Sequence, residues 1–170
     1  MKKTAELGFF LALALIMSYV ESLIPFSFGI PGIKPGLPNL VVVLLLYQSG
    51  AKDALLVNFL RITLAGFLFG SLYSILYALT GAAFSFCAML AGKRIGCFSV
   101  VGVSVLGGVF HNIGQIIIAM LVVETYYVGY YMPFLIAAGT VTGAVLGIAV
   151  AEVMPYLRGQ HLADVHKRAE

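Results

Sequence analysis

Long apolar segments with few charges dominate this sequence and decide what it can fold into. Five of them have the length of a membrane-spanning helix, at about residues 4–24, 53–71, 72–92, 98–123 and 132–154. A sixth, at 39–49, is short for a hydrocarbon core of about 30 Å. Because 61% of the residues are hydrophobic and 10% are charged, a water-soluble domain could not bury this apolar surface. The runs are continuous rather than alternating, so we predict an all-α integral membrane protein.

The distribution of lysine and arginine tests whether the short segment crosses the membrane. If all six segments cross and the N-terminus is cytoplasmic, the cytoplasmic side holds Lys2, Lys3, Lys52, Lys93, Arg94, Arg158, Lys167 and Arg168. The outer side then holds Lys34, as the positive-inside rule requires. This asymmetry predicts six transmembrane helices with both termini cytoplasmic. They form one transmembrane domain at residues 1–156, followed by a polar cytoplasmic tail at 157–170.

The connection at residues 24–39 is rich in glycine and contains four prolines. Proline lacks a backbone N–H and fixes φ, so this segment is not helical. Connections of this length in compact proteins are usually functional or disordered, and the large apolar side chains here favour order. We predict a Gly/Pro-rich outer loop that folds back over the outer mouth of the helices.

Three polar side chains interrupt the segment at 98–123 near its middle. His111, Asn112 and Gln115 share one broad face of a helix with 3.6 residues per turn. Interhelical hydrogen bonds, worth about 0.6 kcal/mol each, explain a single polar residue in such a segment. Three on one face at this depth favour a polar cavity.

Arg61 lies in the middle of another apolar segment, where a charge costs on the order of 3 kcal/mol. Every aspartate and glutamate lies at an end, in a loop or in a tail, so none matches Arg61 in depth. We expect its partners to be carbonyls, water, a bound anion, or the amide oxygens of Asn58, Asn112 and Gln115. Two interpretations stay open, a structural arginine that caps carbonyls and a solute-binding residue.

Glu21, near the outer end of the first segment, and Lys34, in the loop, complete the set of candidate binding residues. Two interpretations stay open for them as well, a surface ion pair of little energy and a pair of solute ligands. A pocket lined by the candidate residues has no internal acidic cluster. We therefore expect it to favour a small polar or anionic solute with an apolar body.

Small residues recur every four positions in the last segment, at Gly139, Gly143, Gly147 and Ala151. The first segment offers the pairs Gly8/Ala12 and Ala14/Ser18 at the same spacing. Such stripes let another helix approach closely. They either pack helices within the chain or form a docking face for a separate membrane subunit.

Motifs for catalysis and for nucleotide or nucleic-acid binding are missing from the sequence. It has no Gly-x-x-x-x-Gly-Lys loop for ATP, no aspartate-rich Mg–diphosphate site, and no basic cluster interleaved with aromatic residues for nucleic acid. Its histidines and cysteines are too scattered in sequence for a metal site. We therefore predict neither an enzyme nor a cofactor.

The motifs PGIKPGLPNLVVVLLLY, DALLVNFLRITLAGFLFGS and GGVFHNIGQ, in this order, resemble the bacterial membrane family of heptaprenyl diphosphate synthase component I, also called Gx transporter. The likeness covers about residues 5–155. That family is similar to the substrate-binding S components of energy-coupling factor (ECF) importers. The resemblance implies a bacterial cell membrane, a loop over an outward-facing site, a separate coupling subunit and two ATPases. It also implies docking positions in the first helix, at Gly8, Ala12, Ala14 and Ser18.

Transport of a vitamin-like molecule or a cofactor precursor is what the resemblance implies, more than synthesis. Prenyl diphosphate synthases bind diphosphate through aspartate-rich motifs that this chain lacks. The competing interpretation is a noncatalytic membrane scaffold for polyprenyl diphosphate synthesis or for a redox assembly. A self-sufficient carrier needs a proton or ion relay, and His111 is the candidate for it in a sequence without mid-membrane carboxylates.

Overall fold

The computed structural model describes the backbone of residues 2–24 and 36–166 and the side chains of 3–24 and 36–157. Within these residues the regular structure is entirely helical, which confirms the predicted all-α class. The α-helices are α1 (Lys2–Leu23), α2 (Pro38–Gln48), α3 (Ala51–Phe69), α4 (Leu72–Ile95), α5 (Val100–Val122) and α6 (Met132–His166). A 3-10 helix, η1 (Tyr126–Tyr131), precedes α6.

Four helical stretches in the described chain are long and apolar enough to cross a membrane: Lys3–Leu23, Leu72–Ile95, Val100–Val122 and Tyr126–Leu157. Two helices differ from these. α2 has only 11 residues, and α3 carries the charged residues Lys52, Asp53 and Arg61. The chain therefore has the helices of a membrane protein, while membrane crossing by α2 and α3 stays a prediction.

Local sequence signals account for both ends of α4 and for the start of α5. Ser71 and Ser74 form a capping box at the start of α4, with each hydroxyl accepting from the other residue's backbone N–H. Gly96 ends α4 in the left-handed region, at φ 78°. The Ser99 hydroxyl then accepts a hydrogen bond from Gly102 N–H and starts α5.

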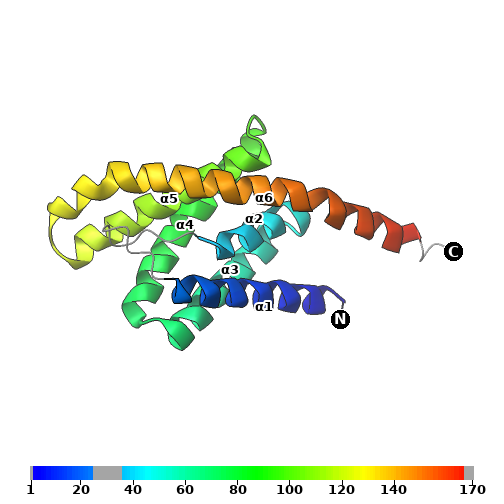
Figure 1. The fold of residues 1–170 in the computed structure, drawn as a ribbon, viewed down its shortest axis with the longest axis horizontal. Coiled ribbons are helices and arrows are strands. Elements are labelled where there is room, and N and C mark those ends of the chain that lie inside the picture. The colour runs from blue at the N-terminus through cyan, green and yellow to red at the C-terminus, as the bar shows by residue number, and fades with distance from the viewer. Residues whose placement is uncertain (1, 25–35, 167–170) are drawn as a thin grey trace.

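The short helix α2 lies at the centre of the bundle, in contact with α1, α3 and α6 (Figure 1). Its side chains from Val41 to Leu46 are at most 3% exposed. The Lys93 ammonium of α4 donates a hydrogen bond to the Leu46 carbonyl at its C-terminal end. A helix enclosed by protein has its backbone groups satisfied internally and need not match the hydrocarbon thickness. This position explains how so short an apolar segment fits the fold.

Glycine contacts hold α5 between its neighbours α4 and α6. A Cβ on Gly108 would lie 2.3 Å from the Gly139 carbonyl oxygen. A Cβ on Gly143 or Gly147 would lie within 2.8 Å of α5 backbone atoms. Gly139, Gly143 and Gly147 are all buried. The docking interpretation is wrong for Gly139, Gly143 and Gly147, because α5 occupies the face that a partner helix would need.

The small residues of α1 divide between the core and the outer surface. Ala14 is fully buried, so it is not a docking residue as the resemblance implied. The half-buried Ser18 donates its hydroxyl to the Ala14 carbonyl at 2.9 Å. Ala12 is exposed, and no atom lies within 4 Å of a Cβ built on the exposed Gly8. Gly8 and Ala12 therefore remain on an open face of the bundle.

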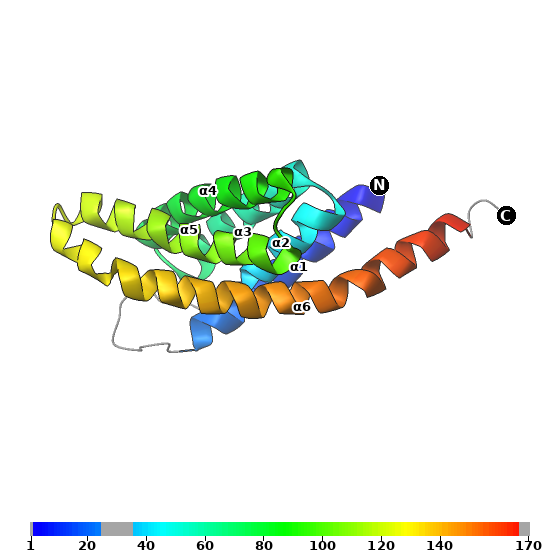
Figure 2. The ribbon, with the colours of Figure 1, turned by 90° about the horizontal axis from the view of Figure 1, so that it is seen from above.

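The bundle has two distinct ends (Figure 2). α1 begins and α6 leaves the bundle at one end, which we name the terminal end, while η1 lies at the opposite end, the loop end. The main apolar core surrounds α2 and includes Phe10, Phe86 and Met154. α6 runs through Pro155 to His166, so the predicted tail at 157–170 begins as a continuation of this helix.

Candidate functional site

A cavity of about 560 Å³ lies within the bundle, and every α-helix contributes to its wall. Val43, Met89, Ile116, Leu135 and Leu146 supply apolar surface. The polar side chains of the wall are Glu21, Asn39, Arg61, Ser74, Tyr77, Ser85, Ser104, His111, Asn112, Gln115, Tyr131 and Thr142. Cavities of this size, mostly apolar with a few convergent polar groups, are typical of small-molecule sites.

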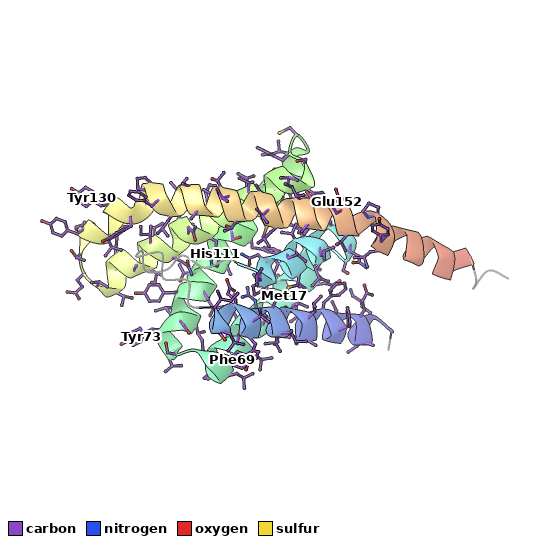
Figure 3. All side chains as sticks on the ribbon, in the orientation of Figure 1. Met17, Phe69, Tyr73, His111, Tyr130 and Glu152 are labelled. Carbon is purple, nitrogen blue, oxygen red and sulfur yellow. The ribbon has the colours of Figure 1, made fainter. Side chains whose placement is uncertain are left out.

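The polar face of α5 forms one side of this cavity. His111, Asn112 and Gln115 all line it, and Figure 3 shows His111 in the middle of the molecule. The Asn112 amide also donates to the Leu135 carbonyl of α6 at 2.7 Å. A Cβ on Gly81 of α4 would lie 2.9 Å from Gln115 Cγ and 3.0 Å from His111 Cε1, so this glycine makes room for both side chains.

Arg61 enters the cavity from α3 and is supported by Asn58, one turn earlier. Its Nη2 donates to the Asn58 side-chain oxygen at 2.6 Å, so the expectation of an amide partner is correct. Asn58 is itself buried and does not line the cavity, which makes it a positioning residue for Arg61. Arg61 Nε is buried and has no hydrogen-bond partner in the described part of the protein. An unsatisfied buried donor costs about 1–3 kcal/mol, which an acceptor in the cavity would relieve.

Glu21 brings a carboxylate to the same cavity, although, as expected, it does not match Arg61 in depth along the helices. Glu21 Oε1 accepts a hydrogen bond from Gly36 N–H at 2.6 Å. α1 and α3 run parallel, because Lys3 pairs with Asp53 near their starts and Tyr19 packs on Phe69 near their ends. Both side chains are long enough to reach one cavity from different depths along these helices.

The predicted loop contributes to the cavity through its described end. Gly36 and the α2 residues Pro38 and Asn39 line it. Lys34 and the rest of the proposed cover, at 25–35, lie outside the described residues. The contact between Gly36 and Glu21 therefore joins the end of this connection to the cavity wall.

Several polar wall residues were not found by sequence reasoning, and α4 supplies three of them. Ser74, Tyr77 and Ser85 share one broad face of that helix, since Tyr77 lies about one turn after Ser74 and Ser85 about three turns after it. Ser85 is 3% exposed, and Ser104 of α5 is 4% exposed. Polar residues in register within apolar helices were the available signal.

The chemistry available at this wall is hydrogen bonding and charge. In the described part of the chain, no three His, Cys, Asp or Glu side chains gather where they could hold a metal ion. The groups that face the cavity are a guanidinium, a carboxylate, an imidazole, amides and hydroxyls. Such a set recognises a small polar molecule and orients it.

Comparison with known families gives a match to the family described as heptaprenyl diphosphate synthase component I, over residues 10–153. No curated protein and no solved structure matches the chain. The match includes residues of every helix that lines the cavity. It confirms the first resemblance found in the sequence.

Proposed function

The chain belongs to the heptaprenyl diphosphate synthase component I family, and we propose that it is the substrate-binding membrane subunit of an importer. Its solute is a small vitamin-like molecule or cofactor precursor, and separate coupling and ATPase subunits supply the energy, as in ECF importers. The chain itself is noncatalytic. The observation that carries this proposal is the cavity of about 560 Å³ on which Glu21, Arg61 and His111 converge from three helices.

The cost of these polar groups favours a binding role over a purely structural one. Ionisable residues inside membrane proteins are rare and usually mark a solute or ion pathway. A scaffold needs only closely packed helices, which the glycine contacts between α5 and α6 already supply. A cavity with charged and amide groups adds nothing to that packing, whereas a solute site requires it.

The proposed topology has six membrane crossings, with the terminal end of the bundle in the cytoplasm of a bacterium. A chain whose two ends lie on the same side crosses the membrane an even number of times, and α1 begins where α6 leaves the bundle (Figure 2). The solute cavity then opens toward the outer side of the membrane. The exposed face of α1 around Gly8 and Ala12 is the proposed docking face for the coupling subunit.

Cysteine labelling tests this topology. Cys97 is exposed in the connection between α4 and α5, which the six-crossing arrangement puts in the cytoplasm. In a Cys87→Ser background, we expect a membrane-impermeant maleimide to label Cys97 in inside-out vesicles and not in right-side-out vesicles. A Cys97→Ser variant controls for other reactive groups. Labelling confined to right-side-out vesicles would contradict the topology.

The second candidate function is a noncatalytic membrane component that assists polyprenyl diphosphate synthesis. The description of the matching family favours it, because that description names a synthase component. In this case Arg61 and His111 only hold helices together. The two candidates predict different chemical changes in cells that lack the chain.

The test compares cells that lack the chain with cells that express it, grown in a rich medium of known composition. Mass spectrometry follows the loss of each small molecule from the medium and, in the same cultures, the cellular polyprenyl products. The import proposal predicts that one solute disappears only when the chain is expressed, with polyprenyl products unchanged. The synthase-component function predicts the opposite result. Cells that lack the chain would then contain less of the polyprenyl products, while both cultures would remove the same solutes from the medium, and the import proposal would fail.

A further inference from the structure

A second hollow lies on the outside of the bundle, between α4 and α5, and shares no wall residue with the solute cavity. We name it the α4–α5 groove. It has a volume of about 650 Å³, and its wall consists of alanine, glycine, cysteine, isoleucine, leucine and phenylalanine residues. Its phenylalanines, Phe84, Phe98 and Phe110, are 37–42% exposed. The groove therefore opens away from the bundle, toward the side that lipid covers in a membrane.

The length of the groove matches one leaflet of a bilayer. On α4 its wall runs from Ala83 to Ile95, which is about 18 Å along the helix axis. Half of a hydrocarbon core of about 30 Å is about 15 Å. α4 itself is long and apolar enough to cross the membrane, and Ile95 is its last residue. The groove therefore runs from one membrane surface to about the middle of the bilayer.

An arginine lies at the surface end of the groove. Arg94 follows the wall residues Ala91 and Cys87 by three and seven positions, so it continues the face of α4 that lines the groove. It is exposed, and no carboxylate pairs with it in the described part of the chain. The neighbouring Lys93 is engaged with α2 instead, because its ammonium donates to the Leu46 carbonyl.

The charge around the groove favours an anion. No aspartate or glutamate occurs between Asp53 and Glu124, a stretch that includes all of α4 and α5. Basic groups beside apolar pockets at a membrane surface bind anionic lipid headgroups. The lipid chain fills the apolar part, and the phosphate forms charge-assisted hydrogen bonds to the guanidinium. An apolar helix of a partner subunit would fill the groove without supplying an anion, so the charge favours a lipid.

We propose that the α4–α5 groove binds one chain of an anionic phospholipid, whose phosphate is held by Arg94. This site is separate from the solute cavity and does not depend on the importer function. It requires only that α4 and α5 lie in a membrane, as their length and composition indicate. In the proposed topology the lipid belongs to the cytoplasmic leaflet.

Fluorescence of a single tryptophan tests this site, since the chain contains no tryptophan of its own. Phe84→Trp places a reporter in the groove wall, and Phe59→Trp places one on the exposed surface of α3, outside the groove. Each full-length variant is reconstituted in phosphatidylcholine vesicles, into which dibrominated phosphatidylglycerol or dibrominated phosphatidylcholine is titrated. Bromine quenches tryptophan at short range. We expect phosphatidylglycerol to be favoured about fivefold over phosphatidylcholine at Phe84→Trp and not at Phe59→Trp.

Three further substitutions in the Phe84→Trp background separate the contributions of charge and shape. Arg94→Gln should make the two brominated lipids quench equally. Lys52→Gln is its matched control, because Lys52 is an exposed cation at the start of α3 and is not part of the groove. This control should keep the fivefold preference. Ala91→Leu fills the groove and leaves the charge in place, and it should also remove the preference.

Each contrary outcome is distinct. Equal quenching by the two lipids at Phe84→Trp would overturn the inference, as would a preference that survives Arg94→Gln. The same preference at Phe59→Trp would overturn it too, because attraction by the net charge of the whole chain would then suffice. Weak quenching of the groove reporter by both lipids would mean that protein fills the groove, as a docked partner helix would. The comparison of the two reporters remains decisive if Arg94→Gln does not fold.

Discussion

Replacing Arg61 with alanine is expected to lower solute uptake by about 100-fold while the amount of protein in the membrane stays at the wild-type level. A hydrogen bond to a charged group contributes about 1.5–3 kcal/mol, and about 2.7 kcal/mol corresponds to a 100-fold change in binding. Removing a centred arginine also removes an insertion cost on the order of 3 kcal/mol. Membrane expression therefore has no reason to fall. The measurement is the initial uptake rate of the solute identified by its depletion from the medium.

The control for this variant is Thr63→Val on the same helix, because the Thr63 hydroxyl bonds to the Phe59 carbonyl and lies outside the cavity. It should transport at the wild-type rate. Loss of membrane expression in Arg61→Ala, with unchanged uptake per molecule, would contradict the binding role. Arg61 would then be the structural arginine that its hydrogen bond to Asn58 also permits.

Replacing Gly139 with leucine is expected to disrupt the contact between α5 and α6. A Cβ at this position would lie 2.7 Å from the Gly108 carbonyl oxygen, and a backbone group cannot rotate away as a side chain can. Overpacking at such sites costs about 3 kcal/mol or more. For a chain of this size that corresponds to a thermal midpoint lower by roughly 6–12 °C. The midpoint is measured by thermal unfolding of the purified protein in detergent.

Gly8→Leu is the matched control, because nothing lies within 4 Å of a Cβ at Gly8. As a purified protein without partner subunits, this variant should unfold at the wild-type temperature. A Gly139→Leu protein with the wild-type midpoint would mean that α6 does not pack on α5 through its glycines. If Gly8→Leu lowers uptake without lowering the midpoint, the proposed docking face on α1 gains direct support.

The helices and the polar wall could be predicted from sequence because each follows from short-range spacing. Apolar runs gave the six helical segments, and the one-face spacing of His111, Asn112 and Gln115 indicated a cavity wall that the structure contains. Arg61 was recognised from its depth in an apolar segment alone. Each of these features depends only on the geometry of a single helix.

Features that depend on how helices meet could not be predicted in the same way. Glu21 and Arg61 line one cavity because α1 and α3 pack in parallel, which no spacing within either helix reveals. The stripe at Gly139 could equally face a partner or a neighbour in the chain, and only the position of α5 decides between them. Small residues permit close packing but do not specify the occupant.

The most direct test of a solute site in this protein is mass spectrometry of small molecules released by denaturing the gently purified protein. The wild type is compared with an Arg61→Ala/His111→Ala variant prepared in the same way. We expect a compound in stoichiometric amount in the wild type that is lost from the variant. Two empty preparations, with a soluble prenyl-transferring enzyme co-purifying with both, would contradict it and leave the polar face of α5 as a contact between helices.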